Sequence, residues 1–145
     1  MSNISKKIIL NQLEYPVKVL LAWGEAIDGK KEFRDFLMKS PYRELGVFCF
    51  ALLNDRKSRK WLAKNNYGHL LATIEGVEGK DSALIWLKKN GFDTLFHFAR
   101  SADSWKDSQR WLKKKDKLLY TISLKIEYVK DEIELKNEDP HKINP

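Results

Sequence analysis

The 145-residue chain has few of the residue types that build disulfides, long loops or phosphate-binding turns. Seven Gly and four Pro leave little room for long loops or linkers, and this favours helices. The single Cys49 lies between Phe48 and Phe50, so we expect a buried thiol in a reducing compartment and no disulfide within the chain. The sequence also lacks a Gly-rich phosphate loop, a Ser-centred nucleophile motif and a Cys pair. These absences argue against several common enzyme classes.

Long apolar runs are absent as well. The longest nearly apolar stretch, residues 45–53, is about half as long as a membrane-spanning helix needs to be. Near the N-terminus, the apolar run at residues 8–10 is too short for the core of a signal peptide. We therefore expect a soluble, cytoplasmic protein that has no membrane partner.

The chain does have a globular protein's share of apolar residues and an excess of positive charge. Hydrophobic residues make up 43% of the sequence, and the length suits one compact domain. The formal net charge is +7 and the pI is about 9.4. Because such a surface attracts polyanions, nucleic acid is a partner to consider.

A motif recurs every 25 residues: an aromatic residue, then a Leu, then a Lys two positions later. A repeat of this length is typical of stacked helical units that bury their apolar faces against one another. Turn and capping residues such as Ser40-Pro41 and Asn90-Gly91 divide each repeat, which predicts a hairpin of two short helices. The aromatic-Leu pairs are Phe36-Leu37, Trp61-Leu62, Trp86-Leu87 and Trp111-Leu112.

This pattern predicts an all-α fold: a right-handed α-α superhelix of about four hairpins, with an N-terminal capping helix and a long C-terminal helix. Asn11-Gln12 stand where the motif requires an aromatic residue and Leu, so this half-repeat should cap the stack. We expect one domain over residues 1–136 and a disordered tail over residues 137–145. The predicted helices are residues 16–27, 30–39, 41–53, 55–64, 67–76, 81–89, 92–102, 104–114 and 117–136.

Tandem antiparallel helix pairs in a curved stack resemble, in their architecture, the HEAT and armadillo class of α-solenoids. The resemblance implies a binding scaffold, because these folds mostly present a concave surface to a partner.

The aromatic-Leu column has two interpretations. Trp rings suit stacking on unpaired bases, but each Trp can also bury roughly 200 Å² against the next hairpin. We expect the second, in which the rings are core. Trp61→Ala or Trp86→Ala should then destabilise the protein by about 3–5 kcal/mol.

The Lys column is the main functional lead. If hairpins stack at about 10 Å, its four residues form a line of positive charge that suits a phosphate backbone. A structural explanation also applies, because each Lys lies in the last turn of a helix, where a cation complements the macrodipole and reaches free carbonyls. The basic segment 110–117 and the off-repeat Trp105 are further candidates. The candidate polyanion- or partner-binding residues are Lys39, Lys64, Lys89, Lys114, Arg110, Lys113 and Trp105.

Catalysis is not expected from this sequence. His69 and His97 occupy different repeat positions and have neither metal-ligand spacing nor an evident carboxylate partner. We predict no catalytic, metal or cofactor site. The leading hypothesis is a non-enzymatic helical-repeat scaffold for protein-protein interaction. The alternative is a nucleic-acid-binding repeat protein that uses the Lys column; an enzyme acting on nucleic acid would need convergent acidic or His residues that we do not find.

Overall fold

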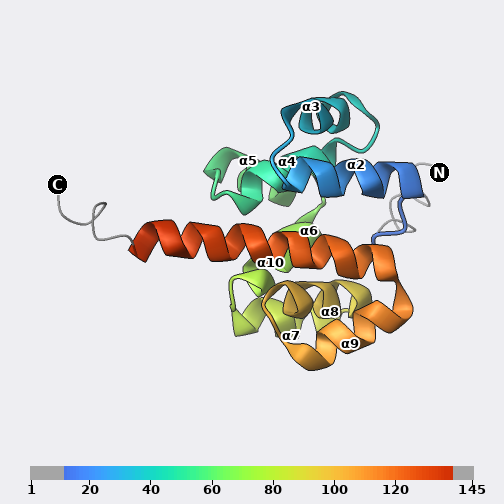
Figure 1. Cartoon of the computed structure of the whole chain (residues 1–145), viewed down its shortest axis with the longest axis vertical. Coiled ribbons are helices and arrows are strands. Elements are labelled where there is room, and N and C mark those ends of the chain that lie inside the picture. Colours follow the sequence, from blue (N-terminus) through green and yellow to red (C-terminus); the bar gives the residue numbers. More distant parts are fainter. Residues whose placement is uncertain (1–11, 139–145) are drawn as a thin grey trace.

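The computed structural model describes residues 12–138, which form nine α-helices and no strand (Figure 1). Each helix lies close to its predicted range, so the all-α prediction is confirmed. Most of the predicted N-terminal capping half-repeat, up to Asn11, lies outside the described residues, and so do residues 139–145 of the predicted tail. The helices are α2 Val17–Ile27, α3 Lys31–Lys39, α4 Arg43–Leu52, α5 Arg56–Lys64, α6 Gly68–Val77, α7 Asp81–Lys89, α8 Asp93–Ala102, α9 Lys106–Lys115 and α10 Lys117–Glu138.

A left-handed backbone conformation recurs wherever one hairpin connects to the next. Gly29, Asn54, Gly79 and Ser104 stand 25 residues apart and have φ angles of 96°, 73°, 84° and 71°. A positive φ just after a helix lets the chain leave the helical path, and Gly and Asn tolerate it best. The sequence period therefore corresponds to a repeated backbone turn.

The second helix of each hairpin lies inside the stack and the first lies outside. The inner helices α4, α6, α8 and α10 pack in succession, and each outer helix packs between two inner ones. The stack also closes on itself, because α10 packs against α2. In Figure 1, α10 lies lengthwise between α2–α5 on one side and α7–α9 on the other, with α6 behind it. The packing is that of a solenoid whose last inner helix meets its first.

One side chain from each inner helix fills the inside of this closed row. Trp23 of α2 stacks on Phe98 of α8, with ring centroids 5.6 Å apart, and meets Phe48 of α4 edge-on at 5.1 Å. Thr73 and Ser123 occupy the same repeat position in α6 and α10, and all five side chains are fully buried. The concave face that an open solenoid offers to a partner is therefore filled by this protein's own core.

Ion pairs attach α10 to the earlier hairpins. Glu78, just after α6, accepts hydrogen bonds from Arg59 at 2.9 Å and from Lys130 of α10 at 3.0 Å. Burial alone raises the pKa of Glu78, but the hydrogen bonds from Arg59 and Lys130 outweigh it, so the pKa lies below its ordinary value. These contacts favour the ionised carboxylate in the folded state.

The stabilisation from Glu78 should therefore depend on pH. A carboxyl group whose pKa is lowered by folding stabilises the fold above its unfolded-state pKa, about 4.3, and loses this effect as the pH falls through the folded-state pKa. We expect Glu78→Gln to lower the free energy of unfolding at neutral pH, and the difference from wild type to shrink in acid. Urea denaturation across this pH range measures it. A difference that is the same at every pH would mean that charge is not the cause.

Two further observations concern the buried thiol and the apolarity of the helices. Cys49 is buried, as predicted, and burial raises the pKa of its thiol to about 12, so the reactive thiolate is disfavoured. Within residues 12–138, no helix combines the length and the apolarity needed to cross a membrane.

Candidate nucleic-acid interface

The first helix of each hairpin ends, and the second begins, at one edge of the molecule, because successive helices alternate in direction. Figure 1 shows α2 and α10 both starting on the same side. Lys39, Lys64, Lys89 and Lys114 stand at this edge, in the last turns of α3, α5, α7 and α9, and we name it the lysine edge. All four side chains are exposed, and none forms an ion pair within residues 12–138.

Charge is divided unequally between the two edges. At the lysine edge, the segments 39–43, 64–68, 89–93 and 114–118 together hold seven Lys or Arg and two Asp. At the opposite edge, the segments 28–32, 53–57, 78–82 and 103–107 hold six Lys or Arg and seven Asp or Glu. The excess positive charge is thus concentrated on one side, which would draw a polyanion to that side.

Within the described residues, none of the four lysines donates a hydrogen bond to a helix-end carbonyl. In α3, α5 and α7, the residue after the Lys donates a side-chain hydrogen bond to such a carbonyl instead. The bonds run from Ser40 Oγ to Leu37 O at 2.7 Å, from Asn65 Nδ2 to Trp61 O at 2.8 Å and from Asn90 Nδ2 to Trp86 O at 2.8 Å. The favourable interaction of each Lys with the helix dipole does not depend on such a hydrogen bond.

The prediction that the aromatic member of each pair is core is wrong for Phe36 and Trp86, whereas Trp61 and Trp111 pack against the core from its side. Phe36 and Trp86 are 51% and 43% exposed, and Trp61 and Trp111 are only partly buried. Neighbouring positions on a helix point about 100° apart, so when the Leu faces the inner helices the ring beside it lies at the side of the helix. The fully buried members are Leu37, Leu62, Leu87 and Leu112.

Trp61 and Trp86 belong to a row of five rings that crosses the second and third hairpins. Trp61 stacks on Tyr67, with centroids 5.7 Å apart and planes 8° from parallel. Trp86 stacks on Phe92 at 5.5 Å and 18°. His69 lies between the two pairs, 6.1 Å from Tyr67 and 5.5 Å from Phe92. The five rings of this aromatic row therefore connect α5 to α7 along the lysine edge, so that this part of the edge is continuous.

Residues 12–16 cross the same edge, over the starts of the inner helices. Gln12 Nε2 donates to Gly91 O at 2.7 Å, and its Oε1 accepts from Thr94 N at 3.1 Å at the start of α8. Tyr15 OH donates to the buried Glu44 carboxylate at 2.8 Å, at the start of α4. This segment therefore ties the first half of the stack to the second.

The Tyr15 hydroxyl should contribute measurably to stability. Burial first, and then the nearby Glu44 charge, raise the pKa of Tyr15 well above its ordinary value, so the hydroxyl stays a donor. Tyr15→Phe leaves the buried carboxylate with one donor fewer, and we expect a loss of about 1–3 kcal/mol in chemical denaturation. Tyr42→Phe is the control, because Tyr42 meets Tyr15 only edge-on, at 5.6 Å. Equal losses in both variants would contradict a role for the hydrogen bond.

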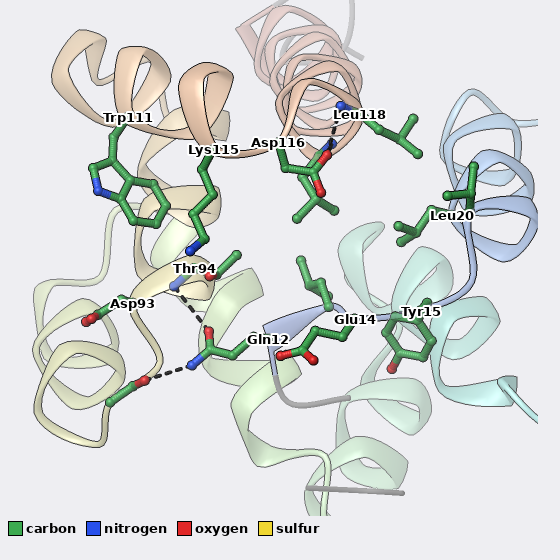
Figure 2. Close-up of a pocket in the computed structure, with 14 residues that line it drawn as sticks. Gln12, Glu14, Tyr15, Leu20, Asp93, Thr94, Trp111, Lys115, Asp116 and Leu118 are labelled. Carbon is green, nitrogen blue, oxygen red and sulfur yellow. Dashed lines mark hydrogen bonds between the residues drawn. The ribbon is translucent and has the colours of Figure 1, made fainter. Parts of the chain in front are cut away.

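A cavity of about 610 Å³ lies between residues 12–15, the start of α8 and the corner between α9 and α10 (Figure 2). Lys115 points into it, and its Nζ also lies 5.6 Å from the ring centroid of Trp111. Among the described residues, the other charged groups that line the cavity are the carboxylates of Glu14, Asp93 and Asp116. One ammonium group among three carboxylates does not suit a polyanion, so the candidate interface is the outer surface around Lys64 and Lys89.

The remaining predicted site residues do not all meet at this edge. Arg110 and Lys113 of α9 are exposed, and Lys113 Nζ lies 5.7 Å from the ring centroid of Tyr120. Trp105 is 50% exposed but stands at the start of α9, at the opposite edge. The Arg100 guanidinium lies 4.7 Å from its ring centroid. The fold therefore separates Trp105 from the Lys column.

His69 and His97 both pack against other side chains of the fold. Burial lowers the pKa of His69 to about 4, so its ring is neutral within the aromatic row. His97 Nδ1 lies 2.9 Å from Ser108 Oγ, but Ser108 is fully buried and also accepts a hydrogen bond from Arg100. Because a substrate cannot reach this hydroxyl, Ser108 and His97 do not act as a nucleophile and its base. Among the described residues, no group of three or more His, Cys, Asp or Glu is placed to hold a metal ion.

With this geometry established, the chain was compared with protein-family models, curated proteins and solved structures. None of them matches it. Its function is therefore inferred from the exposed lysines, the aromatic row and the charge of the lysine edge.

Proposed function

We propose that this protein is a non-enzymatic, nucleic-acid-binding helical-repeat protein whose lysine edge contacts the phosphate backbone. The observation that carries the proposal is an exposed Lys at the same position of all four hairpins, and none of these lysines forms an ion pair with another residue of the described range 12–138. A phosphate that binds such a Lys releases a counterion, and no internal ion pair has to break first. Repetition of the Lys along one edge offers a polyanion several points of contact.

Two other features support binding at this edge rather than in a groove. The inside of the helix row is filled by Trp23, Phe48 and Phe98, so it offers no concave surface. Positive charge is concentrated at the lysine edge, whereas the opposite edge carries slightly more acidic than basic residues. Long-range attraction would therefore present this edge to a polyanion before contact.

A titration with labelled oligonucleotides tests the proposal. We expect the full chain to bind both a single strand and a duplex at about 50 mM salt, and to bind them much more weakly at about 200 mM. Absence of binding at the lower salt concentration would refute nucleic-acid binding. A poly-glutamate peptide of equal charge should bind less tightly; equal affinity would point to an acidic protein partner instead.

A protein-interaction scaffold is the second candidate, and one observation favours it. Helix α7 exposes Ile85 and Trp86 side by side, at 63% and 43% of their surface. Hollows of about 260 and 470 Å³ lie on the two sides of this helix. A partner that buried these side chains would gain apolar contact area. The neighbouring Lys88 and Lys89 would then require acidic residues in that partner.

A further inference from the structure

We infer that the hollow beside Trp86 holds an unpaired base, and that the lysine edge therefore prefers single strands to duplexes. This inference rests on the proposed function, because a base reaches the hollow only when the lysine edge holds the adjoining phosphates.

The hollow lies between α6 and α7 and has a volume of about 260 Å³. The Trp86 ring forms part of its wall, and Leu71, Ala72 and Ala83 supply apolar lining. Gly68, the first residue of α6, also lines the hollow, and a Cβ added there would meet no atom within 4 Å. Since α6 begins at the lysine edge, the hollow has free space at the end where the lysines stand.

The Trp86 ring is held in place for stacking. One face lies against Phe92, with the planes 18° apart, and Phe92 in turn lies 5.5 Å from His69. This support fixes the plane of a side chain that still exposes 43% of its surface. A base stacked on the uncovered part would not have to order a mobile ring first, and such stacking tolerates any base.

Charge selects a nucleotide over other flat ligands. Neither Lys64 nor Lys89 lines the hollow, but Lys64 ends α5 four residues before Gly68 and Lys89 ends α7 three residues after Trp86, so both stand at the lysine edge, where the Gly68 end of the hollow lies. Of the described residues that line the hollow, only Glu75 is charged, and it pairs with Lys80 at 3.5 Å. A ligand with a flat apolar body and adjacent anionic groups fits this surface. In a duplex, a base would have to unpair and leave its stack before it could enter.

The test compares three oligonucleotides of equal length: a thymidine single strand, a strand of abasic sites and a duplex. The wild-type chain should bind the thymidine strand roughly tenfold more tightly than the abasic strand, because only the former can stack on Trp86. Trp86→Leu should abolish this difference, and Trp86→Phe should retain part of it. Ile85→Ala, at the neighbouring exposed position of α7, is the matched control and should keep the full difference. Thermal melts of all three variants check that each is folded.

The outcomes separate this inference from the proposed function. Equal, salt-dependent affinity of the wild type for thymidine and abasic strands would overturn base stacking and leave phosphate binding intact. A thymidine preference that persists in folded Trp86→Leu would also overturn it, because the base would then stack elsewhere. Absence of binding to all three oligonucleotides would overturn the proposed function itself.

Discussion

Replacing Trp23 with Ala is expected to lower the free energy of unfolding by about 3–5 kcal/mol. Trp23 is fully buried inside the closed row of helices, where it contacts Phe48 of α4 and Phe98 of α8. The truncation removes contacts between three helices that are far apart in sequence and leaves a cavity that rigid neighbours cannot fill. Chemical denaturation followed by circular dichroism measures the loss.

Two further variants make this prediction specific. Trp23→Phe keeps an aromatic ring in the stack, and the indole Nε1 that it removes has no hydrogen-bond partner among the described residues, so the loss should be smaller. Trp86→Ala should also cost less than Trp23→Ala, about 1–2 kcal/mol, because Trp86 is 43% exposed. If Trp86→Ala destabilises the protein as much as Trp23→Ala, Trp86 contributes to the core as fully as Trp23 does.

The second large effect is expected on binding. Reversing charge in the double variant Lys64→Glu, Lys89→Glu should weaken binding of a single strand about 10- to 100-fold at low salt. Both side chains are exposed and lie along the continuous part of the lysine edge, where the aromatic row joins α5 to α7. The substitutions remove two phosphate contacts and add two repulsive ones. Fluorescence anisotropy of a labelled oligonucleotide reports the change.

The matched control makes the same change in net charge at the opposite edge. Lys31→Glu, Lys57→Glu alters two exposed residues in the first turns of α3 and α5. An acidic residue is favourable near a helix N-terminus, so this variant should remain folded. We expect its affinity to fall far less than that of the edge variant. An equal fall in both would show that net charge matters and that the position of the lysines does not.

The sequence predicted the fold well because each hairpin is determined locally. Turn residues such as Gly29 and Asn54 recur with the 25-residue period, and they end helices through their own backbone conformation. Closure of the row was not predictable in this way. Closure depends on the packing of α10 against α2, and the contact of Trp23 with Phe98 inside the row joins residues 75 apart in the sequence. No local pattern encodes contacts of such long range.

The candidate site was predicted only in part. The Lys column was found by its 25-residue spacing. The structure places each of these lysines, with its side chain exposed, in the last turn of a helix. The error on Phe36 and Trp86 arose because a repeated aromatic residue was taken as core, whereas only the adjacent Leu is fully buried in all four pairs. Tyr67 and Phe92 were visible as a second aromatic column, and their position at the turn after each Trp was the available signal for stacking. The hollow beside Trp86 depends on how α6 packs on α7, which spacing does not reveal.

The most direct test of the central claim is the salt dependence of binding to a single strand, measured for the wild type and for a variant with Gln at positions 39, 64, 89 and 114. Each phosphate contact adds about −0.7 to the slope of log affinity against log salt concentration. If all four lysines contact phosphates, the slope of the variant should be less steep by about 3 units. An identical slope in the two proteins would contradict the claim that the lysine edge holds the nucleic acid.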